Sequence, residues 1–466
     1  MPAAIPTPDV HLVVLAAGKG TRMKSALPKV LHRAAGRALI DHVLGSSRGV
    51  LPASIVIIIG HQTDKMRSHF AGRSDVQLAV QEPQLGTGHA LLQAEPFLQG
   101  KTGSLLLLSG DVPLLRASTV QALVSHHAKR RAAATVLTAT IDRPDGYGRI
   151  VRKDGAISAI VEHKDASAEE RQIDEINSGV YVFDLGQLFG ALRRIGAGNA
   201  QREYYLPDLV RIYRSEGLVV ETVCLGDPRE ILGVNSRKEL ADVSAILRDR
   251  KNDELMVSGV TIIDPATTWI EQDVVIGPDT VLHPGVYLEG QTRIGSGCEI
   301  HSGVRIIDST VGDGVVINNF CVIRQSAIES GAVVGPFVQL RPASTVCENA
   351  HVGNFVELKN TTLGRGSKAN HLTYLGDATI GEKVNVGAGT ITCNYDGTAK
   401  HPTVIEDGAF IGSDSQLIAP VRVGKNAYVA AGSSITEDVP PDSLAIGRGK
   451  QVNKPGWRAR AKRKSD

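Results

Sequence analysis

An apolar residue followed by glycine recurs at intervals close to six residues between positions 258 and 440. Val334 and Val352, each followed by glycine, are separated by three such repeats. Six residues suit one face of a triangular coil, in which a short strand points an aliphatic side chain inward and glycine takes a positive φ at the turn. A fixed short period also indicates units that bury their apolar side by stacking on neighbours. The pattern predicts a β-solenoid.

The first half of the chain shows a different pattern, in which apolar runs alternate with segments of helical periodicity. The runs at 11–17, 54–60, 104–111 and 133–141 are typical of buried parallel strands. Strands that alternate with helices predict a doubly wound, Rossmann-like α/β domain, whose ligands bind at the carboxyl ends of the strands. The first run leads directly into a glycine-rich stretch at 18–22, a pattern typical of turns whose N–H groups face a phosphate.

Between the two halves lies a stretch whose apolar residues recur at helical spacing among charged residues. These residues are Leu240, Val243, Ile246 and Leu247. One amphipathic linker helix over 237–257 is the simplest interpretation. It separates a first domain over 1–236 from a β-solenoid over 258–449, which is followed by a basic tail over 450–466.

Length, charge and cysteine content limit the kinds of molecule that the chain is expected to bind and the compartment in which it is expected to lie. A chain of 466 residues is too long for one core, and a net charge of +2 does not favour a nucleic-acid partner. Five cysteines without C-x-x-C spacing predict neither a disulfide framework nor a structural zinc site. The N-terminus lacks the pattern of a signal peptide, and no apolar run approaches the length of a membrane span. We therefore expect a cytoplasmic protein with no membrane partner and a solvated basic tail.

Nine segments of the first half resemble, in order, the sugar-nucleotide pyrophosphorylases. They are LAAGKGTRM at 15–23, LPKVLH at 27–32, QEPQLGTGHA at 81–90, SGDVPL at 109–114, GYGRIV at 146–151, IVEHKDA at 160–166, EINSGVY at 175–181, NAQREYYLPD at 199–208 and GVNSR at 233–237. The repeat region resembles the hexapeptide-repeat transferases, which are left-handed parallel β-helices. This resemblance supplies the hand, because the period does not give it.

Together the two halves resemble a family of bifunctional bacterial enzymes. The resemblance implies acetyl transfer from acetyl-CoA to glucosamine 1-phosphate in the C-terminal domain. It then implies uridylyl transfer from UTP to N-acetylglucosamine 1-phosphate in the N-terminal domain, with UDP-N-acetylglucosamine and pyrophosphate as products. It further implies Mg²⁺ as cofactor, a homotrimer, and a place in peptidoglycan and lipopolysaccharide synthesis.

Nucleotidyl transfer brings two polyanions together, so cations must neutralise the charge that develops at the α-phosphate. Arg22 and Lys29 are the candidate side chains beside the glycine-rich turn, and the alternative for each is a solvated surface charge. Asp111 follows an apolar strand, where its oxygens can bind a hard cation. The resemblance assigns the metal to Asp111 and Asn235. The alternative for Asn235 is that it caps the helix that begins near residue 236.

The resemblance also implies contacts with the nucleotide and the sugar. Besides Lys29, Asp111 and Asn235, the implied residues are Leu15, Ala16, Ala17, Gly18, Gln81, Gly86, Thr87, Ser109, Gly110, Gly148, Glu162 and Asn177. Glycine at position 86 allows close approach of the backbone to the base. Glu162 could instead form an exposed ion pair with His163 or Lys164. Many relatives carry an aromatic residue where Ser109 stands, so this chain lacks any contact that needs that ring.

Residues 337–396 hold more polar and aromatic side chains than stacking alone requires, which often marks function. Acetyl transfer needs a neutral amine, and histidine is the natural base near neutral pH. His371 matches the family's general base, although one histidine among 14 would otherwise be read as structural. Arg341 and Lys359, separated by three repeats of six, should stack on one edge as a cationic slot for the sugar phosphate. The alternative is a row of surface charges on adjacent coils.

The resemblance completes the acetyltransferase site. Tyr374 and Asn385 match the sugar contacts. The acetyl-CoA positions are Ala388, Asn394, Tyr395, Ser413, Ala431 and Arg448, the last from a neighbouring subunit of the trimer. The segment NYDGTAKHP, at 394–402, is expected to leave the coil as a loop that covers CoA.

Two rival functions stay open on the sequence. One is a single-function sugar-1-phosphate nucleotidyltransferase whose β-helix serves only for oligomerisation, and such a protein would not need His371 and Tyr374 together. The other is a non-catalytic scaffold of the same folds, which should have lost Lys29, Asp111 or the histidine motif. The sequence retains all of these residues.

Overall fold

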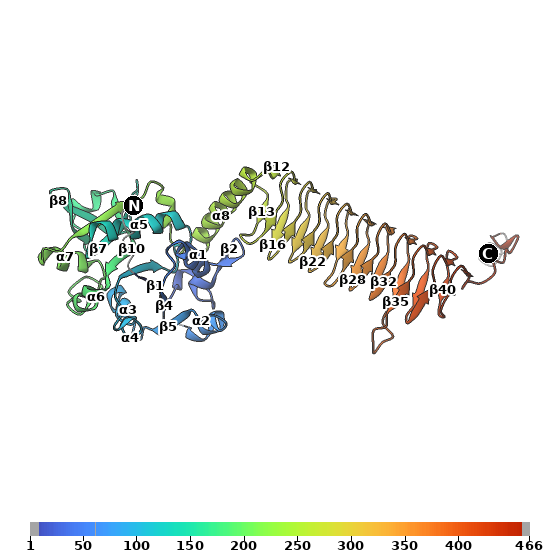
Figure 1. Ribbon diagram of the computed structural model, residues 1–466, viewed down its shortest axis with the longest axis horizontal. Helices are drawn as coiled ribbons and strands as arrows, with labels where there is room; N and C mark the ends of the chain where they lie inside the picture. The colour runs from blue at the N-terminus through green and yellow to red at the C-terminus, as the bar shows by residue number, and fades with distance from the viewer. Residues whose placement is uncertain (1–8, 61, 459–466) are drawn as a thin grey trace, which may run out of the picture. The chain divides into compact units, whose positions relative to one another are not determined.

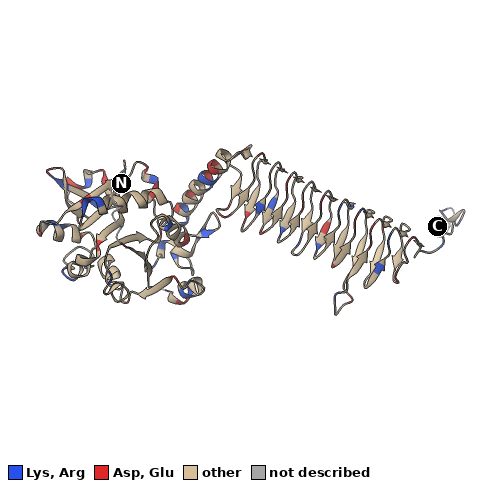
Figure 2. Ribbon diagram, viewed as in Figure 1, with Lys and Arg blue, Asp and Glu red and all other residues tan. Residues whose placement is uncertain are grey.

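The computed structural model describes residues 9–60 and 62–458. Tertiary contacts divide the chain into two compact units, Met1–Leu247 and Arg248–Asp466 (Figure 1). The boundary lies within helix α8 (Arg237–Val257), which covers the range predicted for the linker helix. Charged side chains of both signs occur along α8 (Figure 2). The end of the basic tail, from position 459 on, lies outside the described residues.

A nine-stranded sheet forms the centre of the first unit, in the order β11-β7-β10-β6-β1-β4-β5, with β8 pairing with β10 and β9 pairing with β8. The strands are β1 (Val10–Ala16), β4 (Ser54–Ile59), β5 (Val76–Val80), β6 (Ser104–Ser109), β7 (Ala134–Thr140), β8 (Arg149–Lys153), β9 (Ala156–Val161), β10 (Glu175–Asp184) and β11 (Val220–Cys224). The four predicted apolar runs form β1, β4, β6 and β7. One feature was not predicted: β10 pairs antiparallel with both β6 and β7.

Helices surround the sheet of this unit (Figure 1). They are α1 (Leu39–Ser46), α2 (Thr63–Phe70), α3 (Thr87–Leu92), α4 (Glu95–Leu98), α5 (Ala117–Arg130), α6 (Leu185–Leu192) and α7 (Asp208–Ser215). The sheet is buried on both faces, since Val13 packs into one apolar core whereas Leu12 and Val14 pack into another. Burial on both faces explains why β1 reads as a continuous apolar run.

The second unit is a β-helix made of three stacked parallel sheets. The first sheet runs from β12 (Thr261–Ile262) to β41 (Leu444–Ala445), the second from β13 (Trp269–Ile270) to β40 (Ser434–Ile435), and the third from β14 (Val275–Ile276) to β38 (Val421–Val423). Each strand pairs with the equivalent strand of the next coil, so that Glu299 lies beside Val281 on one side and Val316 on the other. One apolar core fills the interior.

Glycine in the repeat has a different role from the predicted one. Gly277 and Gly295 do not take a positive φ. A Cβ on Gly277 would instead lie 2.7 Å from the carbonyl carbon of Gly295 in the next coil. Positive φ occurs two residues later in the same turns, at Asp279 and Gly297, and at other corners, at residues that include Phe320 and Phe337. The repeat therefore selects glycine mainly because stacked coils approach closely. The prediction of positive φ was wrong at Gly277 and Gly295, whereas Gly335 takes a φ of 101°.

The predicted loop leaves the β-helix between β34 (Ile391–Cys393) and β35 (Thr403–Ile405), and it is visible below β35 in Figure 1. An antiparallel bridge between Tyr395 and Lys400 closes it. Across the part of the chain that the structure describes, no helix is long and apolar enough to cross a membrane.

Candidate active sites

A cavity of about 440 Å³ opens at the carboxyl ends of β1 and β6. These two strands pair in parallel, with Leu15 beside Ser109, and Gly110 N donates to Leu15 O at 2.9 Å. The predicted residues that line the cavity are Leu15, Ala16, Ala17, Gly18, Lys29, Gln81, Gly86, Thr87, Ser109 and Asp111. The volume falls within the range of small-molecule sites. Residues predicted from widely separated segments thus meet at one sheet edge.

The glycine-rich turn brings Lys29 to this edge. Gly20 takes a left-handed φ of 59°, and a Cβ there would lie 2.9 Å from the Cβ of Lys29. A residue other than glycine would be strained by its backbone and would also push Lys29 away.

Lys29 lies between the two residues predicted to bind a metal ion. Its Nζ donates to Asn235 Oδ1 at 2.9 Å and forms an ion pair with Asp111 Oδ2. Asn235 is held here by its neighbour, because Val234 N donates to Asp111 O at 2.9 Å. One carboxylate oxygen and one amide oxygen thus converge on a single cation. Such hard oxygen atoms are the ligands that Mg²⁺ prefers, so the donor set fits this ion.

Asn235 does not cap helix α8. Glu239 Oε2 accepts from Asn235 N at 2.7 Å and from Ser236 Oγ at 3.1 Å, and Ser236 Oγ accepts from Glu239 N at 3.3 Å. This reciprocal pair is a capping box. The alternative predicted for the Asn235 side chain was therefore wrong. Burial raises the pKa of Glu239, but the hydrogen bonds from Asn235 and Ser236, together with the charge of Arg22, lower it overall.

Arg22 lies near Glu239 and is exposed, and it does not line the cavity. Three polar residues that do line it were not predicted: Lys19, Gln84 and Glu203. The Gln84 side chain donates to Ala17 O. Gln84 and Glu203 both lie in segments that resemble the family, but no chemical pattern distinguished them within those segments.

The residues predicted to bind the sugar form a second group. Asn177 N donates to Gly148 O at 2.9 Å, and a Cβ on Gly148 would lie 3.2 Å from Glu162 Oε1. Burial, followed by nearby carboxylates, raises the pKa of Glu162. No ion pair joins Glu162 to His163 or Lys164 among residues 9–60 and 62–458, so that alternative was wrong.

His371 lies at the end of β30 (Lys368–His371), beside Asn354 of β27 (His351–Asn354) in the preceding coil. His371 Nδ1 and Asn354 Oδ1 are 2.7 Å apart. An amide oxygen only accepts, so Nδ1 carries a proton, and in the neutral ring Nε2 is then the nitrogen with a lone pair. This tautomer presents a base to the exposed side of the coil. Asn354 was not predicted, although it lies in the motif-rich region.

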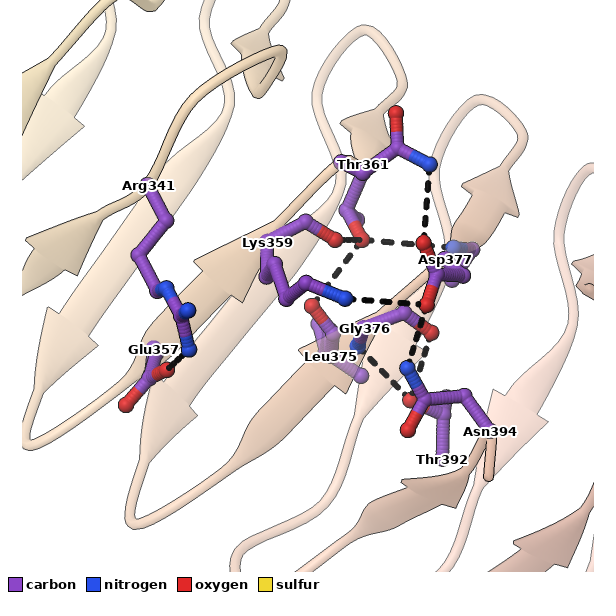
Figure 3. A network of polar contacts seen from close by, with 11 residues as sticks. Arg341, Glu357, Lys359, Thr361, Leu375, Gly376, Asp377, Thr392 and Asn394 are labelled. Carbon is purple, nitrogen blue, oxygen red and sulfur yellow. Dashed lines mark hydrogen bonds and ion pairs between the residues drawn. The ribbon is translucent and has the colours of Figure 1, made fainter. Parts of the chain in front are cut away.

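Arg341 and Lys359 occupy adjacent coils as predicted, but they do not form a cationic slot. Arg341 donates to Glu357 Oε1 at 3.0 Å, whereas Lys359 Nζ donates to Asp377 Oδ2 at 3.2 Å. Figure 3 shows the two charged groups turned to different carboxylates. Two like charges repel, so each cation pairs with the carboxylate of the following coil in preference to approaching the other cation.

A third cation, Lys400, lies close to this pair and was not predicted. The neighbouring Lys359, followed by desolvation and last by the charge of Arg341, lowers the pKa of Lys400, against the opposing charge of Asp377. Lys400 belongs to the loop that leaves the coil after β34. Asn394, at the start of that loop, donates to Asp377 Oδ2 (Figure 3). Asp377 therefore connects the loop to Lys359.

The predicted sugar contacts lie on two different sheets. Tyr374 begins β31 (Tyr374–Gly376) of the second sheet, and its hydroxyl lies against Gly376, where a Cβ would displace it. Asn385 begins β33 (Asn385–Val386) of the first sheet and pairs with Lys368.

Three predicted acetyl-CoA residues, Ala388, Ser413 and Ala431, stack at one corner of the β-helix. Asp414 N donates to Ala388 O at 2.7 Å, and Gly432 N donates to Ser413 O at 2.8 Å, so these corners follow one another. Arg448 donates to Ala431 O at 2.6 Å. Tyr395 is 60% exposed on the loop, and its hydroxyl donates to Gly397 O.

Comparisons with known proteins bear on both units. A MobA-like NTP transferase domain matches residues 12–195, and bacterial transferase hexapeptide repeats match residues 273–308 and 402–437. These matches confirm the predicted fold class, an α/β nucleotidyltransferase domain followed by a left-handed parallel β-helix of hexapeptide repeats.

The chain is similar over nearly its whole length to several bacterial proteins. It is 50% identical to the bifunctional protein GlmU of Pelobacter propionicus, over 98% of this chain and 100% of that protein. It is 52% identical to GlmU of Trichlorobacter lovleyi over 96% and 97%, and 51% identical to GlmU of Brevibacillus brevis over 96% and 96%. The chain therefore belongs to the GlmU family of bifunctional proteins.

Proposed function

We propose that the chain makes UDP-N-acetylglucosamine in two reactions at two separate sites. The second unit transfers an acetyl group from acetyl-CoA to glucosamine 1-phosphate, and the first unit transfers UMP from UTP to the acetylated product. Family membership confirms the predicted class of enzyme, a bifunctional transferase acting on small molecules, and argues against both rivals. The observation that supports the proposal most is that Lys29 meets Asp111 and Asn235 in the first unit, whereas His371 meets Asn354 in the second. A cytoplasmic location stays a prediction.

In the nucleotidyl reaction, a phosphate oxygen of N-acetylglucosamine 1-phosphate attacks the α-phosphorus of UTP in line. A new P–O bond forms as the bond to the bridging oxygen breaks, and pyrophosphate leaves. Asp111 and Asn235 would hold Mg²⁺, which when bound neutralises phosphate charge. Lys29, already aligned by both residues, supplies a second positive charge inside the cavity. Arg22 adds positive charge from outside it.

The first unit also recognises uridine and the sugar. Gln81 is buried, and its Nε2 donates to Gly86 O at 3.0 Å, which fixes the amide and leaves its oxygen to accept from a uracil edge. Gly86 lies so close to Tyr204 that a Cβ would be 2.8 Å from its carbonyl oxygen. Thr87, the next residue, lines the same side of the cavity. The group of Gly148, Glu162 and Asn177 contacts the hydroxyls and the acetyl group of the sugar.

In the acetyl reaction, the amine of glucosamine 1-phosphate attacks the thioester carbonyl. His371 Nε2 takes the proton of the amine as the C–N bond forms, and the C–S bond then breaks to release CoA. Asn354 holds the Nδ1 proton of His371, so the other nitrogen remains basic. Arg341 and Lys359 exchange their present carboxylates for the sugar phosphate, which Lys400 also contacts. Tyr374 and Asn385 contact the sugar.

Acetyl-CoA lies along the corner formed by Ala388, Ser413 and Ala431, with Asn394 and Tyr395 of the loop beside it. Arg448 pairs with a phosphate of CoA. In the trimer we propose, this arginine comes from a neighbouring subunit.

Incubation with glucosamine 1-phosphate, acetyl-CoA, UTP and Mg²⁺ tests the whole proposal. We expect release of free CoA thiol, followed by pyrophosphate, and formation of UDP-N-acetylglucosamine. Thiol assay, pyrophosphate assay and mass spectrometry measure the three products. Pyrophosphate without thiol would support the single-function rival, and neither product would support the scaffold.

Two substitutions should separate the two reactions. His371→Ala removes the general base, so thiol release should fall by about 100- to 10,000-fold. Asp111→Asn removes a charged metal ligand, so pyrophosphate formation from N-acetylglucosamine 1-phosphate should fall by about 100-fold or more. Each variant is the control for the other, because each should leave the other reaction unchanged. Loss of both reactions in one variant would contradict two independent sites.

Lys359→Ala should weaken the use of glucosamine 1-phosphate. A charge-assisted hydrogen bond contributes about 1.5–3 kcal/mol, so kcat/KM should fall about 10- to 100-fold. Arg365→Ala is the control, since Arg365 is another cation of the β-helix that pairs with a carboxylate, Glu348, at 3.1 Å. Equal losses in both variants would argue against a specific phosphate contact.

The full chain should sediment as a trimer, at three times the mass of one chain. Because Arg448 would act across the interface, an inactive His371→Ala chain mixed with an inactive Arg448→Ala chain should regain part of the acetyltransferase activity. Analytical ultracentrifugation and a thiol assay on the mixed subunits measure the two effects. A monomer with full activity would contradict this part of the proposal.

A further inference from the structure

Two histidines and one glutamate gather near the start of the β-helix, several coils before the acetyltransferase residues. His283 follows β15 (Val281–Leu282), and His301 follows β18 (Glu299–Ile300) in the next coil. His283 N donates to Ile300 O at 2.9 Å, so the two histidines occupy the same position in successive coils. Their rings stack with centroids 4.4 Å apart. No step of either proposed reaction uses these residues.

The three side chains present their donor atoms at the spacing of a metal site. Glu299 Oε1 lies 3.1 Å from His283 Nε2 and 3.6 Å from His301 Nε2. One atom from each residue can be chosen so that all lie within 4.8 Å of one another. Zinc binds histidine nitrogen and carboxylate oxygen at about 2.0–2.2 Å, which places two ligands of a tetrahedron about 3.3 Å apart. The two separations lie on either side of this value.

An ordinary ion pair would not balance the charges of these three side chains if both histidines were protonated. Among the described residues, Glu299 has no ion pair with a lysine or arginine, and its strand neighbours in the adjacent coils are Val281 and Val316. Two stacked imidazolium rings would repel each other, and one carboxylate neutralises only one of them. A divalent ion lets both imidazoles stay neutral and gives the carboxylate a counter-charge.

Other histidines near carboxylates in this chain lack the second ring. His126 lies 3.3 Å from Glu221, which also pairs with Arg130, and His401 lies 2.7 Å from Asp396, so that each carboxylate meets a single histidine. Over the described ranges, the group at the start of the β-helix is the one in which three such ligands converge. This difference provides a control within the same chain.

We propose that His283, Glu299 and His301 bind one divalent zinc-type ion per chain. Two imidazole nitrogens and one carboxylate oxygen form a donor set that suits Zn²⁺, and a water molecule would fill the fourth position. Mg²⁺ prefers an all-oxygen set, so this site is chemically distinct from the one at Asp111 and Asn235. The ion would join two successive coils through their side chains.

Isothermal titration calorimetry of the full, tag-free chain with Zn²⁺ tests this site. Excess Mg²⁺ in the buffer keeps the oxygen ligands of the first unit occupied. We expect one site per chain that the His283→Ala/His301→Ala variant loses. Glu299→Gln keeps both rings and the overall shape, and it should weaken binding by more than the roughly 10- to 100-fold that loss of an outer-shell partner costs.

His126→Ala is the matched control, because it breaks a histidine–glutamate pair without a second ring and should leave the titration unchanged. Co²⁺ provides an independent readout, since a tetrahedral site gives strong visible absorption that Glu299→Gln should abolish. Retention of both transferase activities shows that the variants fold. The absence of a site in the parent chain, or the same titration in Glu299→Gln, would overturn the proposal.

Discussion

Stacking of equivalent residues from coil to coil is the constraint on which the β-helix depends. Paired strands in successive coils lie about 4.8 Å apart, so the neighbours of a residue are set by its position within the coil. Asn354 meets His371 in this way, and His283 meets His301. A solenoid thus converts a sequence separation of one coil into side-chain contact. Its chemistry is arranged in columns along the stack.

The first unit gathers distant residues through a different constraint. Parallel strands end at a common edge, and the pairing of Leu15 with Ser109 places the segments that follow β1 and β6 side by side. Lys29 and Asp111 meet there. Asn235 lies much later in the sequence. It is held in place because the main-chain N–H of its neighbour, Val234, donates to the carbonyl oxygen of Asp111. The site therefore depends on backbone pairing before any side chain is placed.

The sequence could predict the position of residues better than the direction of their side chains. The period placed Arg341 and Lys359 on adjacent coils, but it carried no information on which carboxylate each would choose. Lys359 pairs with Asp377, and this choice of partner depends on side-chain rotamers and ion-pair energies. The capping box of Ser236 and Glu239 is different, since its S-x-x-E spacing was present in the sequence and would have freed Asn235 from the capping role. No comparable sequence pattern predicted the antiparallel pairing of β10.

The same stacking explains where a β-helix can acquire a ligand site. His283, His301 and Asn318 occupy one column, as their backbone bonds to the next coil show, and the column continues with Gly335. A Cβ on Gly335 would lie 3.1 Å from the Cβ of Asn318. The column therefore carries glycine at the position where the neighbouring coil leaves no room for a side chain. Side chains at the same position of two successive coils can touch, as those of His283 and His301 do, or can turn to different partners, as those of Arg341 and Lys359 do. Such a contact between like residues is unfavourable when both carry charge, and a shared ion removes the conflict.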